Sequence, residues 1–458
     1  MKPTEDTLSQ VHEWLQDCGV ARHQLKYSSA QDWIKVTLPV EDVEKLLDTQ
    51  YSVFKHSDGA HIVRTSEWSL PLHLHQHIET IQPTNSFFSP KTQRSTVKQV
   101  LVADLDLDLS AKAFDAPNKA TVDTACNITA VTPTCLRTLY GEYNFNIPRS
   151  GTNFLPGTID YVPKSTGNNS VALCNYLGEV NNRSDVNSFL QKFRPEAAAD
   201  AFNFTTTVID GGSDQQTPLN SSQQAAGTDL EGNLDAETII GITHPTPLFT
   251  FNTGGQPPFV PDAATPTDTN EPYLTWVQFI LNQTSVPNVI STSYGDDEQS
   301  VPLSFATSVC NSFAQLGARG VSLVFSSGDN GVGRAANCIT NDGKNTSTFL
   351  PAFPASCPYV TTVGATKNVN PEIVAVDASN GFVSGGGFSN YFARPSYQDT
   401  VVSKYVTSLG TNFKGLYNTS GRGYPDIAAQ GFHYVVVWNG TLVSLDGTRY
   451  IHPVRHIF

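Results

Sequence analysis

From about residue 130 onward, short apolar runs that end in glycine- or proline-containing turns alternate with stretches of helical periodicity. Residues 289–295 and 321–325 are two such runs, and residues 305–316 between them have the apolar spacing of an amphipathic helix. Strands that alternate with helices in this way form βαβ units with parallel strands. The sequence therefore predicts an α/β domain built on a mostly parallel sheet flanked by helices.

The first 90 residues have the pattern of a separate, smaller α/β unit. Helical spacing occurs at 7–17 and 40–47, and strand-like alternation at 33–38 and 61–64. Turn-rich segments around Pro83 and Pro90 follow. We therefore expect an N-terminal domain over residues 1–90, a linker over 91–125 and a second domain over 126–458.

The composition excludes several classes of function. The chain has 458 residues, 39% of them hydrophobic and 15% charged, with a formal net charge of −14. Binding of nucleic acid phosphates needs clustered Lys and Arg, so nucleic acid is not the expected partner. No run of about 18 apolar residues is present, so no membrane span is expected. The acidic balance suits a protein that works at low pH, and it is equally common in ordinary soluble proteins.

Two features point to the secretory pathway, although the polar N-terminus has no apolar run and we expect no signal peptide there. Asn-x-Ser/Thr glycosylation sequons occur at Asn127, Asn168, Asn182, Asn203, Asn220, Asn282, Asn345, Asn418 and Asn439. The chain also has seven cysteines, of which Cys126 and Cys135 are near enough in sequence to close a small loop. An odd number of cysteines leaves at least one thiol outside any intrachain disulfide.

His73, His75 and His77 stand at alternate positions. On a strand, this spacing would place the three imidazoles on one face, where they could bind a metal ion. No further ligand lies nearby in sequence, so a pH-sensitive segment or a solvated strand face is the favoured interpretation. We expect no metal site in this chain.

Glu231 and Asp235 precede an apolar run and stand four residues apart. On a helix they would lie one turn apart on one face, where two carboxyl groups can share a proton and act as a general base in acid. The competing interpretation is a capping box, in which Thr228 and Glu231 only terminate the helix.

Asp329 follows the apolar run 321–325 within the turn Ser327-Gly328-Asp329-Asn330-Gly331. Ligands of open α/β sheets bind at the carboxyl ends of the strands, which is where this turn is expected. The alternative is that Asp329 only bonds the local backbone. Gly385 and Gly386 lie in a run of three glycines that would let the backbone approach a ligand closely, or would form a flexible turn.

The sequence gives little support to other peptidase types. His244 and His433 are the histidines between residues 80 and 450, and neither is followed by glycine as the base of a subtilisin would be. Both are expected to be structural. The sequence contains no Asp-Thr-Gly or Asp-Ser-Gly pair of an aspartic peptidase and no His-Glu-x-x-His motif of a zinc peptidase.

Together these motifs resemble the sedolisins, a family of serine-carboxyl peptidases that includes tripeptidyl-peptidases. Residues 231–235 match the family's Glu-x-x-x-Asp element, 293–295 its Ser-Trp/Tyr-Gly strand and 327–331 its Ser-Gly-Asp-Ser-Gly turn. Similar blocks follow in the family's order at 353–360, 363–366, 384–389, 394–398 and 423–429. The resemblance covers about residues 130 to 448, and the N-terminal part is similar to the family's prodomain.

The resemblance implies a subtilisin-like fold preceded by a ferredoxin-like α/β prodomain that inhibits its own enzyme. It implies that Glu231 is the general base toward a serine hydroxyl, that Asp235 orients Glu231, and that a protonated Asp329 is the oxyanion-hole donor. The substrate-binding residues would be Ser293, Tyr294, Gly295, Gly385 and Gly386. Because a carboxylate base and a carboxylic acid donor both require acid, the implied enzyme acts at low pH. The resemblance also implies that it is extracellular.

The resemblance stops after Thr448, where the family continues with the nucleophilic serine and this chain has Arg449. We therefore expect the chain to lack the third member of a Ser-Glu-Asp triad, to be incomplete at both ends and to be inactive as written. No cofactor is expected in this chain, because the family's calcium site would lie beyond its C-terminus. The alternative is a non-catalytic secreted glycoprotein that binds peptides in the retained cleft.

Overall fold

The computed structural model describes residues 2–55, 61–84, 98–101, 122–140, 169–263, 265, 268, 270–333 and 337–448. Most of the predicted linker, together with Arg449 and Asn168, lies outside these residues. In this part of the chain, no helix is long and apolar enough to cross a membrane.

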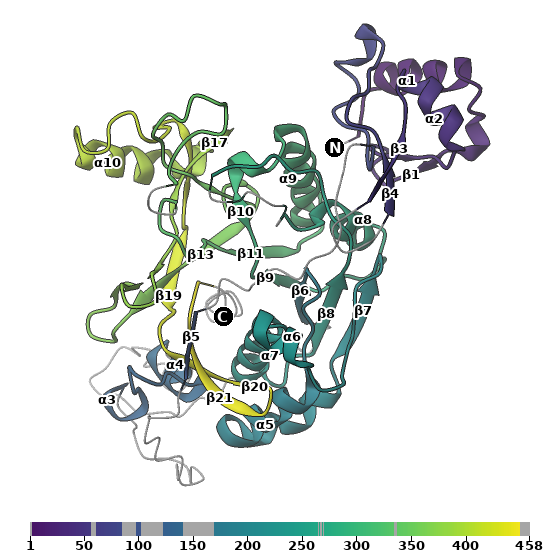
Figure 1. Ribbon diagram of the computed structural model, residues 1–458. Helices are drawn as coiled ribbons and strands as arrows, with labels where there is room; N and C mark the ends of the chain where they lie inside the picture. The colour runs from purple at the N-terminus through teal and green to yellow at the C-terminus, as the bar shows by residue number, and fades with distance from the viewer. Residues whose placement is uncertain are drawn as a thin grey trace, which may run out of the picture.

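The larger domain is built on a sheet whose described strands number eight, and seven of them are parallel (Figure 1). The parallel strands are, in spatial order, β7 (Thr205–Ile209), β8 (Leu248–Thr253), β6 (Val171–Asn175), β9 (Val289–Thr292), β11 (Ser322–Ser326), β13 (Thr361–Lys367) and β19 (Ile427–Gln430). Strand β14 (Ile373–Val374) pairs antiparallel with β13. The prediction of a mostly parallel sheet is confirmed.

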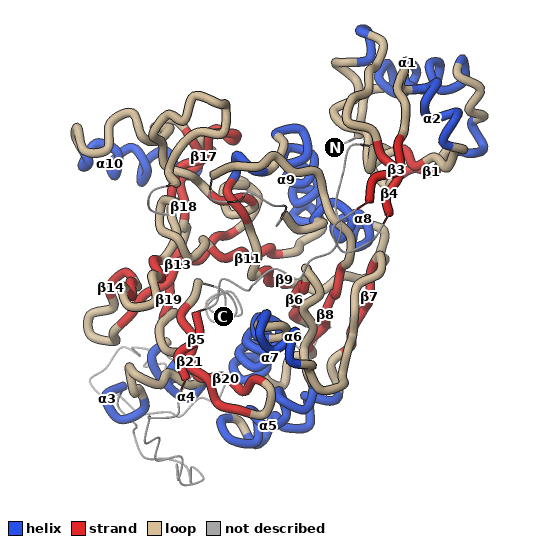
Figure 2. Tube along the Cα trace, in the orientation of Figure 1, coloured by secondary structure: helices blue, strands red, loops and turns tan. Residues whose placement is uncertain are grey.

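Helices cover both faces of this sheet, so that its central strands are buried on both sides (Figure 2). Alternate residues of β6 point into two different cores: Val171 and Leu173 into one, Ala172 and Cys174 into the other. The first core includes α4 (Pro133–Leu139), α5 (Arg183–Phe193) and α7 (Leu230–Thr243), and the second includes α8 (Tyr273–Leu281) and α9 (Leu303–Ala318). The period-two alternation of a strand thus explains the continuous apolar runs in the sequence.

The remaining elements surround the sheet. Two short helices are α3 (Val122–Ala125) and α6 (Ser221–Ala226), and a peripheral helix is α10 (Asp399–Leu409). Smaller pairings join β10 (Asp296–Asp297) to β12 (Ala352–Phe353), β15 (Val376–Asp377) to β16 (Phe382–Val383), and β17 (Gly387–Ala393) to β18 (Gly421–Tyr424). An antiparallel sheet contains β20 (Tyr434–Trp438), β21 (Thr441–Asp446) and β5 (Lys98–Leu101).

The N-terminal unit is a small α/β domain, as expected. It consists of α1 (Glu5–Asp17), β1 (Lys26–Tyr27), β2 (Ile34–Lys35), α2 (Val40–Leu46), β3 (Ser52–Lys55) and β4 (His61–Arg64). In the described residues β1 pairs with β2 and β3 with β4, each as an antiparallel hairpin. Of the strand expected over 33–38, Ile34 and Lys35 form β2 and pair with Tyr27 and Lys26.

The expected strand with three histidines on one face is wrong. A short 3₁₀ helix covers Leu72–Leu74, and turns follow it. Its period of about three residues directs alternate side chains to different sides. His77 Nδ1 faces the hydroxyl of Thr7 at 3.0 Å, whereas His75 Nε2 faces the Leu70 carbonyl at 3.1 Å.

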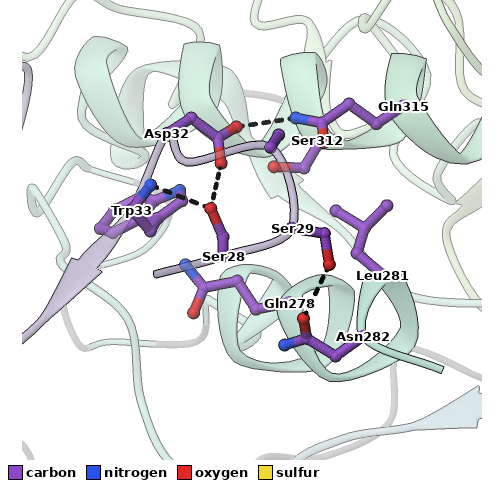
Figure 3. Close-up of a pocket in the computed structure, with 10 residues that line it drawn as sticks. Ser28, Ser29, Asp32, Trp33, Gln278, Leu281, Asn282, Ser312 and Gln315 are labelled. Atoms are coloured by element: carbon purple, nitrogen blue, oxygen red, sulfur yellow. Dashed lines mark hydrogen bonds between the residues drawn. The ribbon is translucent and has the colours of Figure 1, made fainter. Parts of the chain in front are cut away.

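The N-terminal domain sits on helices α8 and α9 of the larger domain (Figures 1 and 3). Gln315 donates a hydrogen bond to Asp32 at 2.7 Å, and Ser308 donates one to Glu79 at 2.9 Å. The pocket at this contact is lined by Ser28, Ser29, Ala30, Asp32, Trp33, Gln278, Leu281, Asn282, Ser312 and Gln315. Polar groups from both domains therefore meet across it.

Two disulfides lie in the larger domain. One joins Cys126 to Cys135 with an S–S distance of 2.06 Å. The other joins Cys310 on α9 to Cys357 and was not expected from the sequence. Two disulfides in one chain suit an oxidising compartment.

Arg422 is the cation of a buried ion pair that connects β18 to the sheet. Its side chain is fully buried, and its Nη2 lies 2.6 Å from Asp426 Oδ2. It also donates to the carbonyls of Gly423 and Val360. Removal of this cation would leave the Asp426 carboxylate without its cationic partner, although Thr362 and Gln398 still donate to it.

We therefore predict that Arg422→Met lowers the free energy of unfolding by about 3 kcal/mol. Urea denaturation followed by tryptophan fluorescence measures the loss. The matched control is Arg394→Met, since Arg394 pairs with the exposed Asp399 and should cost less than about 1 kcal/mol. Equal losses in the two variants would contradict a stabilising role of the buried pair.

Candidate active site

The carboxyl ends of β6, β9 and β11 meet at one edge of the sheet. Cys174 pairs with Thr292, and Thr292 pairs with Phe325, so the three strands end in register. Ser293 therefore follows β9 beside the turn that carries Asp329 after β11. This edge is where open α/β sheets bind their ligands.

Helix α7 begins at the same edge because its first turn is bonded to the segment that follows β6. Asn181 donates its side-chain amide to the Gly232 carbonyl at 2.5 Å, and the Asn182 backbone N–H donates to Asn233 Oδ1 at 2.8 Å. A Cβ atom at Gly232 would come within 2.1 Å of the Val180 carbonyl oxygen. The close approach of α7 to this segment thus requires glycine at position 232.

Glu231 and Asp235 both lie on α7, one turn apart, and are 1% and 2% exposed. The helix begins at Leu230, and its N-cap is Asp229, in the left-handed conformation at φ 68°, and not Thr228. The capping-box interpretation is therefore wrong for this helix: Thr228 precedes its N-cap. Every residue of α7 is buried, which explains the absence of a clear polar face in its sequence.

Asp235 is connected to the neighbouring strand by a direct hydrogen bond. The Ser293 hydroxyl donates to Asp235 Oδ1 at 2.7 Å, and both side chains are buried. Ser293 comes directly after β9, so this bond fixes α7 against the carboxyl edge of the sheet. In this structure the Ser293 hydroxyl is therefore a hydrogen-bond donor to the Asp235 carboxylate.

Asp329 makes long-range contacts, so the interpretation as a residue that only bonds its local turn is wrong. Its Oδ1 accepts from the Thr448 backbone N–H at 2.9 Å and from the Thr448 hydroxyl at 3.0 Å. The Gly328 backbone N–H lies 3.1 Å from the same hydroxyl oxygen. The turn after β11 thus meets the residue that directly precedes Arg449.

Gly385 and Gly386 pack against this turn. The Gly385 backbone N–H donates to the Gly328 carbonyl at 2.7 Å, and a Cβ atom at Gly385 would lie 2.1 Å from the Ser327 carbonyl oxygen. These glycines therefore allow close backbone packing against the turn that carries Asp329.

The other three predicted substrate-binding residues are placed as follows. Tyr294 is 4% exposed and contacts the ring of Tyr176 at a centroid distance of 5.3 Å. Gly295 lies against Phe353, whose carbonyl oxygen would be 2.8 Å from a Cβ at that position. Ser293 and Tyr294 are therefore buried, whereas Gly295 is partly buried.

Glu179 is a component of this region that we did not single out from the sequence. It follows β6, is buried, and its Oε2 accepts from the Gly232 N–H at 3.3 Å. Burial, followed by the negative charge of Asp229, raises the pKa of Glu179 to about 8. Burial likewise raises the pKa of Asp229 to about 7. The rule that identified Asp329, a polar residue just after a buried strand, would also have identified Glu179.

Comparisons with known proteins agree with this architecture. Residues 1–87 match the family described as "Pro-kumamolisin, activation domain". The tripeptidyl-peptidase SED2 of Arthroderma otae is 36% identical over 99% of this chain and 70% of its own length. The probable tripeptidyl-peptidase SED3 of Arthroderma benhamiae is 36% identical over 99% of this chain and 69% of its own length.

A solved structure of Pseudomonas sedolisin, a serine-carboxyl proteinase in complex with pseudo-iodotyrostatin, is also similar. It is 23% identical, covers 63% of this chain and 72% of its own length, and has a TM-score of 0.41. The activation domain, the parallel sheet and the relatives that match nearly the whole chain define a peptidase precursor. The chain belongs to the sedolisin family, within which its matched relatives are tripeptidyl-peptidases.

The raised pKa of Glu179 predicts how stability depends on pH. The folded protein holds this proton up to about pH 8, whereas an unfolded glutamate releases it near 4.5. Folding therefore binds a proton between these values, and the contribution of Glu179 to stability is full below pH 4.5 and is lost as the pH rises toward 8.

We predict that Glu179→Gln and the wild type melt at similar temperatures at about pH 4, and that the variant melts at the higher temperature at about pH 8. The difference in unfolding free energy at the higher pH should reach a few kcal/mol, since each pKa unit corresponds to about 1.4 kcal/mol. Calorimetry at both pH values measures it. The exposed Glu41→Gln variant is the control, and parallel pH curves for wild type and Glu179→Gln would show that Glu179 does not carry this linkage.

Proposed function

We propose that the protein is the precursor of an acid-acting serine-type peptidase whose machinery is Glu231, Asp235 and Asp329. The observation that supports this best is the contact between Asp329 and Thr448. The backbone N–H and the hydroxyl of Thr448 both donate hydrogen bonds to Asp329 Oδ1, and position 449 comes next in the chain. A serine at position 449 would therefore directly follow Thr448, which contacts Asp329, the residue proposed for the oxyanion hole.

In this proposal Glu231 removes the proton from the attacking hydroxyl, and Asp235 orients Glu231. The hydrogen bond from Ser293 stabilises the negative charge of Asp235, so that the proton taken from the attacking hydroxyl rests on Glu231 until it passes to the leaving amine. Burial of both groups keeps water from competing for that proton. A carboxylate base has an appropriate strength only in an acidic medium.

Asp329 would stabilise the oxyanion of the tetrahedral intermediate. Because Oδ1 accepts two hydrogen bonds from Thr448, a proton on this carboxyl group belongs on Oδ2, from which it can be donated. A carboxylic acid donates only when it is protonated, so this role also requires acid.

Arg449 replaces the serine that the family places after Thr448. The chain with this residue therefore has a base and an oxyanion donor but no nucleophile, and we propose that it does not cleave peptides. This same observation supports the second candidate, a non-catalytic secreted glycoprotein that binds peptides. The names of the matched relatives favour release of tripeptides over internal cleavage in the enzyme itself.

The N-terminal domain is proposed to act as the intramolecular inhibitor. It matches an activation domain and contacts α8 and α9 through polar side chains, which water can replace when the domain leaves. Peptides or proteins are the other proposed partners, and neither nucleic acid nor a membrane is proposed.

We predict that the chain with Arg449 has no peptidase activity at any pH, since loss of the nucleophile alone lowers kcat about 10⁶-fold in subtilisin. A variant with Arg449→Ser, followed by the family's sequence, should process itself and hydrolyse an unblocked peptide between about pH 3 and 5. In that background, Glu231→Gln or Asp329→Ala should each reduce the rate at least about 10²-fold.

The matched control is Glu237→Gln, which changes another buried carboxyl of α7. Glu237 Oε2 accepts from the Val437 N–H at 2.9 Å, and glutamine keeps that acceptor. Its rate should stay close to that of the serine variant. Cleavage by the Arg449 chain, or an optimum above neutral pH in the serine variant, would refute the mechanism.

Secretion is proposed from the sequons and the disulfides. Six of the sequon asparagines are exposed: Asn127, Asn203, Asn220, Asn282, Asn345 and Asn439. We predict that the native protein, isolated from the culture medium of its organism, loses mass on endoglycosidase treatment as measured by mass spectrometry. An intracellular, unglycosylated protein would contradict the secretory assignment.

A further inference from the structure

Three side chains with metal-binding groups converge in a cluster that contains none of the proposed catalytic carboxyl groups. They are Asp377 at the end of β15, His433 in the turn between β19 and β20, and Asp446 at the end of β21. One ligand atom from each lies within 4.8 Å of those of the other two. Because they come from three separate strands and turns, this convergence is a property of the fold and not of one acidic loop.

The imidazole of His433 is oriented by the backbone of another segment. Its Nδ1 lies 3.1 Å from the Ile128 carbonyl oxygen. Since a carbonyl only accepts hydrogen bonds, Nδ1 carries the hydrogen and Nε2 carries the lone pair. Histidines that bind metals commonly donate their second ring N–H to a carbonyl in this way.

The two carboxylates are also oriented by neighbouring donors. Asn380 Nδ2 donates to Asp446 Oδ2 at 2.6 Å, and the His433 backbone N–H donates to Asp446 Oδ1 at 2.8 Å. On the other side, the backbone N–H and hydroxyl of Ser379 donate to Asp377 Oδ1 at 2.8 and 2.7 Å. Such outer contacts hold carboxylate ligands in place before an ion arrives.

The negative charges of Asp377 and Asp446 favour the binding of a cation. Asp446 is fully buried, yet among the ion pairs of the described residues neither Asp446 nor Asp377 has a lysine or arginine partner. The comparable carboxylate of Asp426 is paired with buried Arg422. Two carboxylates side by side repel each other, and a divalent ion would neutralise them.

We propose that Asp377, His433 and Asp446 bind a divalent transition-metal ion of the Zn²⁺ class. One imidazole nitrogen with two carboxylate oxygens suits Zn²⁺, whereas Ca²⁺ and Mg²⁺ favour oxygen ligands alone. Three protein ligands leave the fourth tetrahedral position for water. The ion would hold the segment 446–448 in place, and with it the contacts that Thr448 makes to Asp329.

Isothermal titration of the full chain with Zn²⁺ tests this proposal and needs no peptidase activity. We expect one ion per chain, with affinity at least about tenfold weaker in Asp377→Asn and in His433→Asn. Asparagine suits both positions: it keeps the acceptor for Ser379 at 377, and at 433 it tolerates the left-handed backbone (φ 54°). Circular dichroism and melting curves confirm that each variant is folded.

Two controls separate this site from other histidines. His244 lies 2.6 Å from Asp200 without a third ligand among the described residues, so Asp200→Asn should leave Zn²⁺ binding unchanged. His75→Gln should also leave it unchanged. The proposal is overturned if the wild type binds no Zn²⁺, if Asp377→Asn and His433→Asn bind it as well as the wild type, or if binding is lost in a control. Tighter binding of Ca²⁺ or Mg²⁺ than of Zn²⁺ would overturn the assigned class of ion.

Discussion

The parallel pairing of β6, β9 and β11 is the constraint on which the rest of the structure depends. Since these strands end in register, the segments that follow them meet at one edge of the sheet. Glu179 follows the first strand, Ser293 the second and Asp329 the third. Hydrogen bonds from these segments then fix α7 and Thr448, so the candidate site is assembled by strand register and not by one local motif.

The sequence predicted the elements with strong periodicity and predicted less well what depends on distant contacts. The apolar pattern of residues 305–316 indicates α9 because the helix is amphipathic, and the run at 321–325 indicates β11 because a buried strand is continuously apolar. By contrast, the alternating histidines suggested a strand, since spacing alone does not reveal the turns after Leu74. Asp329 and Thr448 are 119 residues apart, so no local pattern reveals their contact.

Several carboxyl groups in the interior of this protein have raised pKa values. Besides Glu179 and Asp229, burial raises the pKa of Glu237 and Glu298, and raises that of Asp268 to about 7. Each group prefers its neutral form inside the protein, and each therefore favours the folded state more in acid than at neutral pH. The interior is thus matched to the acidic medium that the proposed chemistry requires.

The disulfide between Cys310 and Cys357 gives the N-terminal domain a rigid support. Cys310 lies on α9 between Ser308 and Gln315, the two side chains that donate to Glu79 and Asp32. A helix held covalently at its centre keeps its shape whether or not a partner lies on it. Departure of the N-terminal domain would then resemble the dissociation of two preformed surfaces, with an equilibrium set by their contacts and by the length of chain between them.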